Sequence, residues 1–422
     1  MKKIFILGAS ALQIPMIQKA KENGLYVYAL DYNPSAVGIP FADEFLCIST
    51  IDREAVLAAA KKYKPDFIMT STSDMPVRTA AWVNEKLGLK RDLEYEDAIC
   101  ATDKDRMRRR MQECKVPVPK FYAAYSMEDF IGKSRIFRER FVAKPADNAA
   151  SRGVVLVDTL NNRSVGFLKN IYNYVHGFSR SGVVMVEEYM EGPEVSVEIF
   201  TIDGEPHIIT ITDKMVTNLP YFVETGHTEP SVLPDIELKD IRRVAIAAVK
   251  AIRMQNGPCH AEIKVTPKGA KLVEIAARMG GDFITSKLVP MSTGVDMTGC
   301  CMDSVIGNEV NCTPVCDKGS AIRFMYLGSG QAVPGINSEI ATDVRKKYRI
   351  SSIEGEDIAG SMPGVTEVEL YVKPGDEVGI LTNSNGRFGH VIAGGKDAKE
   401  AAANAEDALR VIKFEFERLE NE

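Results

Sequence analysis

The sequence lacks long apolar runs, long basic runs and low-complexity segments. No stretch approaches the ~20 apolar residues that cross a bilayer, and 58 acidic residues outnumber 52 basic ones. Phosphate binding by a nucleic-acid partner needs a concentrated positive surface, which this balance does not favour. The most basic stretch, Arg106–Arg110, falls in a helical pattern and is interpreted as a solvated helix face. We therefore expect neither a membrane nor a nucleic acid as a partner.

Several catalytic and binding motifs are also missing. Gly8 follows the first predicted strand and Asp31 ends the second, but residues 8–13 hold a single glycine, which disfavours a dinucleotide site. The eight cysteines form no paired C-x-x-C knuckles, so the cluster at residues 300–316 is interpreted as buried or partly buried thiols rather than a zinc site. Cysteines in a long chain without a secretion signal indicate reduced thiols and a cytoplasmic protein.

The 422 residues exceed one hydrophobic core, so two to four domains are expected. From Met1 to about Leu93 strands and helices alternate, which predicts a parallel sheet covered by helices. After Pro119 short β-prone runs with interspersed helices predict a mixed α+β region, and a third region begins near Thr313. Its last helix should begin after Asp397, because Glu400 stands at the capping-box spacing.

The predicted elements of the first region are three strands and three helices. The strands are Lys3–Leu7, Tyr26–Leu30 and Phe67–Thr70, and the helices are Gln13–Asn23, Asp52–Tyr63 and Met75–Leu87. A further helix is expected from Thr102, whose hydroxyl could cap it together with Asp105.

The most informative segment is HAEIKVTPKGAKLVEIAARMGG, residues 260–281. Two β-prone runs flank a Pro-Lys-Gly turn signal, so the segment predicts a hairpin centred on Lys268. In that register Glu262 lies opposite Glu274, with His260 on the same face and Arg278 nearby. Two facing carboxylates suit Mg²⁺, although a surface hairpin with salt bridges explains the pattern equally well.

Two further segments carry chemistry. The first is a strand ending in Lys144-Pro145, followed by a turn of small residues and a second strand from Val154, which would form a flap over phosphate. The second is VVMVEEYMEGPEVSVE, residues 183–198, in which an apolar strand runs into acids and a Gly-Pro break. By composition alone each segment is only a strand connection.

These three segments, in this order, resemble the ATP-grasp superfamily, and residues 1–422 are similar to its carboxylate-amine ligases, including L-amino acid ligases. The resemblance implies a Rossmann-like pre-ATP-grasp domain over residues 1–100 and an ATP-grasp domain over 101–312, with ATP between its two subdomains. Residues 313–422 would form the α+β closing domain. There Gly386–Gly394 and the following helix resemble biotin carboxylase-like members.

The resemblance also implies roles for individual residues. Lys104 and Lys144 would contact the nucleotide phosphates under a loop at Asn148–Val154, and Glu194 would hold the ribose. The adenine would be taken by Glu187 and by the backbone of Glu188, Tyr189 and Met190. The remaining implied roles are magnesium binding by Glu262 and Glu274, stabilisation of the transferred phosphate by Arg278, and closure over phosphate by Ser151, Arg152 and Gly153.

The chain departs from the family pattern at two places. Ala276 stands where many members have a metal-binding asparagine, and the phosphate loop holds one glycine, Gly153, so that Arg152 would supply charge instead. The acceptor side would involve Glu224 and His227, which follow a strand in a segment of mixed charge and aromatic residues. For His260 a hydrogen-bonded structural role is favoured over a catalytic one.

The resulting hypothesis is a cytoplasmic ligase that uses ATP and Mg²⁺, with Mn²⁺ as a possible substitute. It would phosphorylate a small carboxylate substrate to an acyl phosphate and join it to a small amine substrate, forming an amide or peptide bond. A homodimer is compatible with the resemblance. The alternatives are a biotin carboxylase-like or purine-pathway ligase that uses bicarbonate, a non-catalytic nucleotide-binding protein, and a dinucleotide oxidoreductase.

Overall fold

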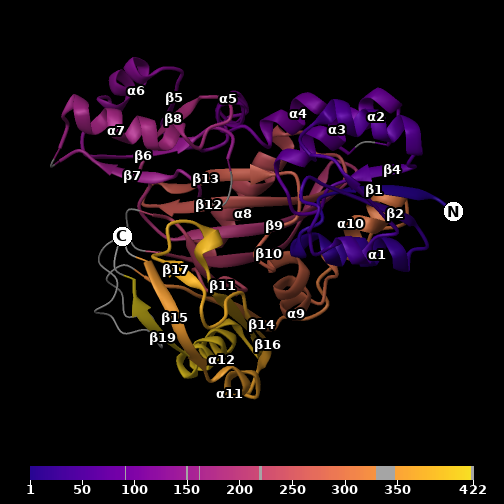
Figure 1. Ribbon diagram of the computed structural model, residues 1–422. Coiled ribbons are helices and arrows are strands. Elements are labelled where there is room, and N and C mark those ends of the chain that lie inside the picture. The colour runs from indigo at the N-terminus through magenta and orange to yellow at the C-terminus, as the bar shows by residue number, and fades with distance from the viewer. Residues whose placement is uncertain (91, 149–150, 161, 218–220, 329–346, 420–422) are drawn as a thin grey trace. The chain divides into compact units, whose positions relative to one another are not determined.

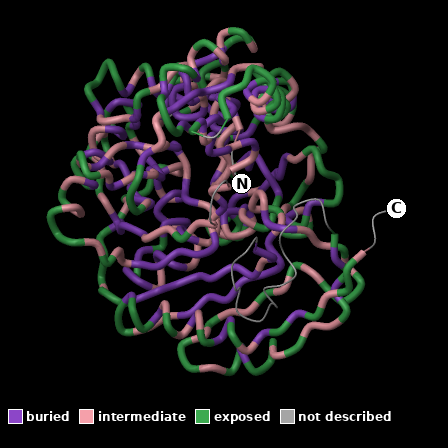
Figure 2. Tube along the Cα trace, turned by 90° about the vertical axis from the view of Figure 1, so that its left-hand side faces the viewer, coloured by how far each residue is buried: buried purple, intermediate pink, exposed green. Residues whose placement is uncertain are grey.

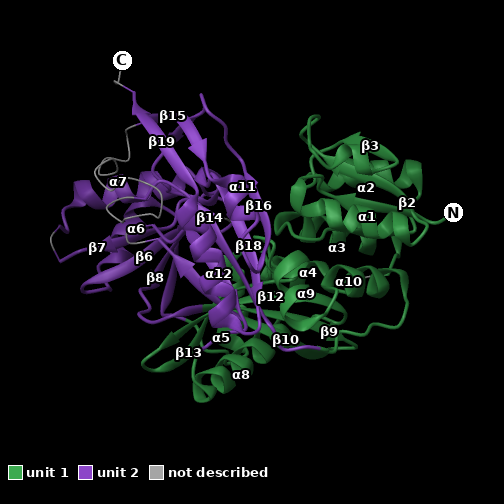
Figure 3. Cartoon of the chain, turned by 90° about the horizontal axis from the view of Figure 1, so that it is seen from below, with its two compact units in different colours: residues 1–118, 195–211, 233–315 green, residues 119–194, 212–232, 316–422 purple. Residues whose placement is uncertain are grey.

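The structure is a computed structural model that describes residues 1–90, 92–148, 151–160, 162–217, 221–328 and 347–419. Contacts divide the chain into two compact units (Figure 3). Unit 1 comprises residues 1–118, 195–211 and 233–315, and unit 2 comprises residues 119–194, 212–232 and 316–422. The division into three domains at residues 100 and 312 stays a prediction.

Each unit combines helices and strands (Figure 1). Unit 1 contains β1 (Lys3–Leu7), η1 (Ala11–Gln13), α1 (Ile14–Glu22), β2 (Tyr26–Asp31), η2 (Ile39–Phe41), β3 (Glu44–Cys47), α2 (Arg53–Tyr63), β4 (Phe67–Met69), α3 (Met75–Leu87), α4 (Tyr95–Cys100), α5 (Lys104–Glu113), β9 (Glu194–Ile202, of which Glu194 is assigned to unit 2), α8 (Asp235–Ala251), β12 (Gly257–Thr266), β13 (Gly269–Ala276), η3 (Ile284–Leu288), α9 (Val289–Thr293) and α10 (Met297–Ile306). Unit 2 contains β5 (Phe121–Ala124), α6 (Met127–Ser134), β6 (Arg140–Pro145), β7 (Val155–Asp158), α7 (Val165–His176), β8 (Val184–Glu188), β11 (Glu224–Glu229), β14 (Gly319–Met325), β15 (Lys347–Glu354), α11 (Glu356–Gly360), β16 (Val365–Leu370), β17 (Glu377–Gly379), η5 (Ser384–Gly386), β18 (Gly389–Gly395), α12 (Ala398–Val411) and β19 (Lys413–Arg418). Strand β10 (Glu205–Val216) passes from unit 1 into unit 2.

The N-terminal sheet is parallel, with strand order β3-β2-β1-β4. Phe5 and Leu7 alternate toward α2 and α3, where they pack with Val56 and Val83. In Figure 1, α2 and α3 cover one face of this sheet and α1 covers the other. All six elements predicted for this region are present within two residues of the predicted bounds. Strand β3 was not predicted; it is four residues long, and its residues are exposed or half-buried.

The second sheet of unit 1 runs β13-β12-β9-β10. Its odd-numbered residues on β9 and β12, such as Val197 and Ala261, pack against α8, where Val244 and Ala248 are fully buried. Because side chains alternate along a strand, the even-numbered residues point to the opposite face. Figure 2 shows how buried residues follow the long strands. Chemistry-bearing residues of this sheet are therefore gathered on the face away from α8.

Unit 2 contains the antiparallel sheet β5-β8-β6-β7, the run β10-β11-β14-β18-β16 and the small sheet β17-β15-β19. Helices α6 and α7 cover one face of the first sheet, where Phe130 and Tyr172 pack on Phe141. The capping prediction for α12 is confirmed, since Asp397 accepts a hydrogen bond from the backbone of Glu400. The described residues contain no helix long and apolar enough to span a bilayer.

Three local predictions were wrong. The hydroxyl of Thr102 donates to the carbonyl of Ala98, and Asp103 instead caps α5, because the chain still belongs to the end of α4 at Thr102. The basic stretch is not simply a solvated face, since Arg108 is fully buried and donates to the carbonyl of Val273 at 2.7 Å. A bulge after Glu262 shifts the hairpin register near its turn, so Lys264 faces Lys271.

A carboxyl group in unit 1 that is largely removed from water gives a test of stability. Asp92 is largely buried, its Oδ1 has no hydrogen-bond partner among the described residues, and Lys90 lies 3.9 Å away. Burial raises the pKa of Asp92 to about 6, so the folded state loses stability as pH rises from about 4, the ordinary pKa of an aspartate, to about 6. Asp92→Asn should raise the free energy of unfolding at pH 8 by about 1–3 kcal/mol. Near pH 4 the difference should vanish.

Urea denaturation at both pH values measures this effect. Asp317→Asn, at an exposed position, is the matched control and should change stability at neither pH. Equal destabilisation by Asp92→Asn at both pH values would show that the carboxylate contributes a needed contact instead.

Candidate functional site

The face of the unit 1 sheet opposite α8 holds the predicted pair of acids. Glu262 on β12 lies directly opposite Glu274 on β13, as the predicted hairpin requires. The ammonium group of Lys104, the first residue of α5, lies 2.9 Å from Glu274 Oε1. Burial disfavours a charged lysine, but the charge of Glu274 outweighs this and raises the pKa of Lys104. Both carboxylates keep about a quarter of their surface exposed and so remain open to a ligand.

His260 lies on the same face and contacts two acids. Its Nδ1 lies 2.5 Å from Oε1 of the fully buried Glu198 on β9, and its Nε2 lies 3.6 Å from Glu262. Burial alone would lower the pKa of His260, but the charge of Glu198 raises it to about 9. The contacts agree with the predicted hydrogen-bonded structural role, because the ring lies between Glu198 of β9 and Glu262 of β12. Ala276, at the position of the missing asparagine, pairs directly with His260.

Arg278 follows β13 and joins the hairpin to the carboxyl edge of the parallel sheet. Its Nε lies 2.7 Å from Asp74, the residue that precedes α3, and its side chain is only 14% exposed. The backbone N–H of Met279 donates to the carbonyl of Ser71, which fixes the two segments against each other. Ligands commonly bind outside the carboxyl ends of parallel strands, so this edge is a chemically useful place for the arginine.

In unit 2, Lys144 and Glu187 lie on the face of the four-stranded sheet away from α6 and α7. Lys144 pairs in register with Met185, and Val142 pairs with Glu187, so the two charged residues are diagonal neighbours. Their charged atoms are 2.7 Å apart and both side chains are less than 8% exposed. This buried pair brings together a predicted phosphate-binding lysine and a predicted adenine-binding acid.

Strand β8 ends at Glu188, one residue after Glu187. The backbone N–H of Glu188 donates to the carbonyl of Lys120, and its carboxylate accepts a hydrogen bond from the N–H of the same residue. Tyr189 is half-buried, with its ring 6.3 Å from that of Phe222, and Met190 is buried. The strand pairing therefore already occupies one backbone donor of the four predicted adenine-binding residues.

The described part of the predicted phosphate loop is held by unit 2 itself. Ser151 donates a side-chain hydrogen bond to the carbonyl of Phe222, and Asn148 donates to the carbonyl of Phe178. Gly153 has a φ of +75°, and a Cβ there would lie 2.8 Å from Phe178. This glycine is therefore required by both backbone conformation and packing. Ala149 and Ala150 of the predicted loop lie outside the described residues.

A buried lysine joins the predicted ribose and acceptor residues. Lys214 on β10 is 3% exposed, and its ammonium lies 2.8 Å from Glu194 and 3.5 Å from Glu224. Arg387 donates to the backbone carbonyl of Glu224 and lies 3.4 Å from its carboxylate. The guanidinium also stacks 3.8 Å from the ring centre of Phe324, so two cations surround Glu224.

His227, the other acceptor candidate, is buried on β11. Its ring meets Phe324 edge to face at 6.3 Å, and its backbone carbonyl accepts a hydrogen bond from Arg323. Glu224 lies three residues earlier, at the start of the same strand. The orientation of the His227 ring is set by its packing against Phe324. Its acceptor role stays a prediction.

Four charged residues of these clusters were given no role by the sequence reasoning: Asp74, Glu198, Lys214 and Arg387. Two had a usable signal. Glu198 continues the alternation of β9 that also carries Glu194, and Asp74 precedes a Met-Pro helix start. Neither the partner of Lys214 nor that of Arg387 follows from spacing along the chain.

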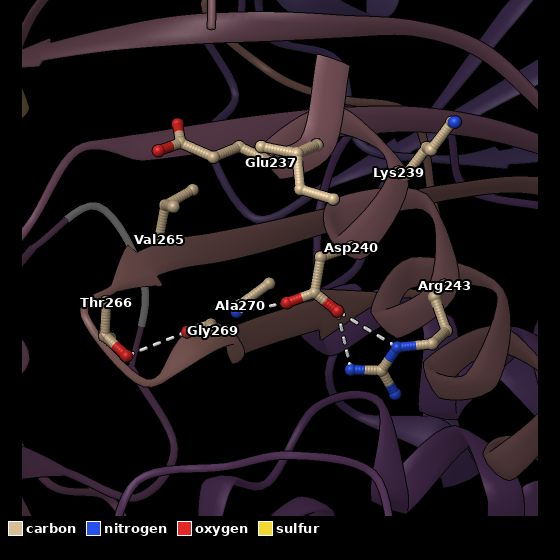
Figure 4. A pocket seen from close by; sticks show the side chains of 9 residues that line it. Glu237, Lys239, Asp240, Arg243, Val265, Thr266, Gly269 and Ala270 are labelled. Carbon is tan, nitrogen blue, oxygen red and sulfur yellow. Dashed lines mark hydrogen bonds and ion pairs between the residues drawn. The ribbon is translucent and has the colours of Figure 1, made fainter. Parts of the chain in front are cut away.

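Unit 1 also contains a hollow of about 490 Å³ beside the hairpin turn and the first turns of α8 (Figure 4). Asp240 lines the hollow, and its carboxylate accepts a hydrogen bond from the backbone N–H of Ala270 and pairs with Arg243. None of the predicted site residues lines this hollow.

Gly280 gives a direct test of the packing behind the acidic face. A Cβ at this position would lie 2.9 Å from both the Glu198 carboxylate and the His260 ring. Gly280→Ala should therefore lower the free energy of unfolding by about 1–3 kcal/mol, because neither buried side chain can move freely. Gly281→Ala is the matched control, since a Cβ there meets nothing within 4 Å. Thermal unfolding of both variants measures the difference, and equal melting temperatures would contradict the contact.

Comparison with known families matches two parts of the chain. Residues 137–286 match the model of the ATP-grasp domain, and residues 348–417 match the model of the L-amino acid ligase C-terminal domain 2. The fold is similar to that of an L-amino acid ligase from Bacillus licheniformis, with a TM-score of 0.79 and 18% identity over 99% of each chain.

Curated relatives agree with these matches. An uncharacterised protein, y4rH of Sinorhizobium fredii, is 26% identical over 72% of this chain, and carnosine synthase 1 of Gallus gallus is 24% identical over 67% of it. The chain spans 58% and 33% of the lengths of these two relatives. The 3-methyl-D-ornithine–L-lysine ligase of Methanosarcina mazei is 21% identical over 99% of this chain and 97% of its own length. The chain therefore carries an ATP-grasp domain and an L-amino acid ligase C-terminal domain 2.

Proposed function

We propose that this protein is an ATP- and Mg²⁺-dependent carboxylate-amine ligase that forms an acyl phosphate and then an amide or peptide bond. The observation that carries the proposal is the opposed pair Glu262 and Glu274, with Lys104 and Arg278 beside it, in a chain with both family domains. The names of two relatives support the same reaction class, since one is an L-amino acid ligase and the other a ligase of 3-methyl-D-ornithine and L-lysine.

The donor set fits magnesium. Two carboxylates face each other across a strand pair, partly exposed, which matches the one or two carboxylates and several waters that Mg²⁺ prefers. Without a cation, two opposed acids repel each other, and the positive groups near them include Lys104, His260 and Arg278. When bound, Mg²⁺ neutralises phosphate oxygens. Glu262 and Glu274 would hold it.

The two buried lysines would serve the phosphates of ATP. Lys104 pairs with Glu274 and Lys144 pairs with Glu187, so each ammonium is held in place by an acid that a polyphosphate would compete with. Glu187 and the following residues would receive the adenine, and Glu194 the ribose hydroxyls. Positioning and charge neutralisation are the main requirements of phosphoryl transfer, and these residues supply both.

The proposed reaction has two steps, phosphoryl transfer to the carboxylate and attack by the amine. A substrate carboxylate oxygen attacks the terminal phosphorus of ATP, ADP leaves, and an acyl phosphate forms. The amine attacks the acyl carbon, the C–N bond forms, the C–O bond to phosphate breaks, and the amine loses a proton. Arg278 would hold the transferred phosphate oxygens, and its pairing with Asp74 sets its orientation. Glu224 and His227 would border the incoming amine.

Glu274→Gln tests the metal assignment. Removing one carboxylate charge should weaken Mg²⁺ activation of ADP release at least tenfold, because a dication loses one of two anionic ligands. Chelation of metal should abolish turnover, and Mn²⁺ should restore part of it. Lys268→Gln, at the exposed hairpin turn, is the control.

The assay screens amino acids and small carboxylates, alone and in pairs, with mass spectrometry of the products. ADP release with bicarbonate alone would instead favour a carboxylating enzyme.

Lys144→Met tests the nucleotide assignment. ATP affinity should fall at least tenfold, because the phosphates lose a buried cation. The variant also leaves Glu187 buried without its partner at 2.7 Å, so Lys144→Arg is measured alongside as a fold-preserving substitution. Lys169→Met, on the exposed side of α7, is the control. Unchanged ATP affinity in a folded Lys144→Met protein would remove Lys144 from the site.

A further inference from the structure

A second group of potential metal ligands lies in unit 2. Glu367 and Glu369 on β16 and His390 on β18 each offer one ligand atom, and these three atoms lie within 4.8 Å of one another. Glu369 pairs directly with His390, and Glu367 lies two residues earlier on the same side of β16. The sheet itself therefore brings the three side chains together.

The two ring nitrogens of His390 meet different partners: Tyr371 and Glu369 lie on the Nδ1 side, and Glu367 lies on the Nε2 side. The imidazole of His390 is fully buried, and its Nδ1 lies 2.7 Å from the Tyr371 hydroxyl. Its Nε2 points at Glu367, at 3.2 Å from Oε1. A ligating histidine is usually oriented by a hydrogen bond to its other ring nitrogen, and Tyr371 supplies that contact. The ring of Phe324 closes the other side of the imidazole at 6.3 Å.

The two carboxylates are accessible to solvent, whereas the imidazole is buried. The side chain of Glu369 is 52% exposed and that of Glu367 is 28% exposed, so an ion can enter from solvent and keep a bound water. Ligand atoms up to 4.8 Å apart must approach one another by roughly 1.2–1.5 Å to surround one tetrahedral ion, since ligand bonds to zinc are about 2.0–2.2 Å. Rotation of the exposed Glu369 side chain can provide it.

We propose that Glu367, Glu369 and His390 bind a transition-metal dication, of which Zn²⁺ is the representative. The imidazole donor favours such an ion over Mg²⁺, which prefers an all-oxygen shell. The bound ion links β16 to β18 and stabilises the folded state in proportion to its binding. The site is separate from the acid pair on the hairpin, and it does not depend on the proposed ligase function.

The test is Zn²⁺ binding to the full-length, chelator-stripped protein, measured against a chromophoric competitor in excess Mg²⁺. We expect one Zn²⁺ per chain, an affinity at least tenfold weaker in Glu369→Gln, and a visible Co²⁺ spectrum that is lost in that variant. Glu369→Gln changes a half-exposed side chain and should fold. Tyr371→Phe should weaken Zn²⁺ binding ~10–100-fold, an effect that a purely structural hydroxyl would not produce.

His207→Gln, at an exposed histidine on β10, is the matched control and should keep the wild-type affinity. The proposal is overturned if the wild-type protein binds no Zn²⁺, or if Glu369→Gln binds it as tightly as the wild type. The second outcome would mean that His390 is a structural histidine bonded to Tyr371 and Glu367, and that any zinc is held elsewhere.

Discussion

Desolvation of charge is the constraint on which the candidate site depends. Lys104, Lys144 and Lys214 have side chains that are 7%, 7% and 3% exposed, and each is within 3 Å of a glutamate oxygen. An ammonium group removed from water is costly unless an anion compensates it. Each lysine is therefore held at a defined position by its acid. A nucleotide phosphate could replace that acid as the partner, which makes a buried lysine well suited to phosphate binding.

The alternation of strand side chains decides where these charges lie. In the unit 1 sheet one face packs on α8, and Glu198, His260 and Glu262 lie on the opposite face. The unit 2 sheet repeats the arrangement, because α6 and α7 cover the side opposite Lys144 and Glu187. A one-residue slip in any of these strands would move the charged side chains into the apolar core. Packing of the core thus fixes the position of the site.

Sequence reasoning was most successful where a pattern is local. In the parallel N-terminal region three of the four strands and the helices α1 to α3 were predicted, and the facing pair Glu262 and Glu274 follows from turn position and alternation alone. It was less successful where a neighbour from elsewhere in the chain decides the outcome. The bulge after Glu262 shifts the pairing of the two strands between that residue and the turn. Arg108 is buried where a backbone carbonyl of β13 accepts its hydrogen bond.

The sequence by itself determined the elements, the sides on which their residues lie and the family resemblance, because apolar periodicity, capping and turn signals act over a few residues. Only the tertiary structure decided which charges meet. Glu198 reaches His260 over 62 positions and Lys104 reaches Glu274 over 170. The partner of a buried charge is chosen by the packing of whole sheets and helices, and no spacing along the chain records that choice.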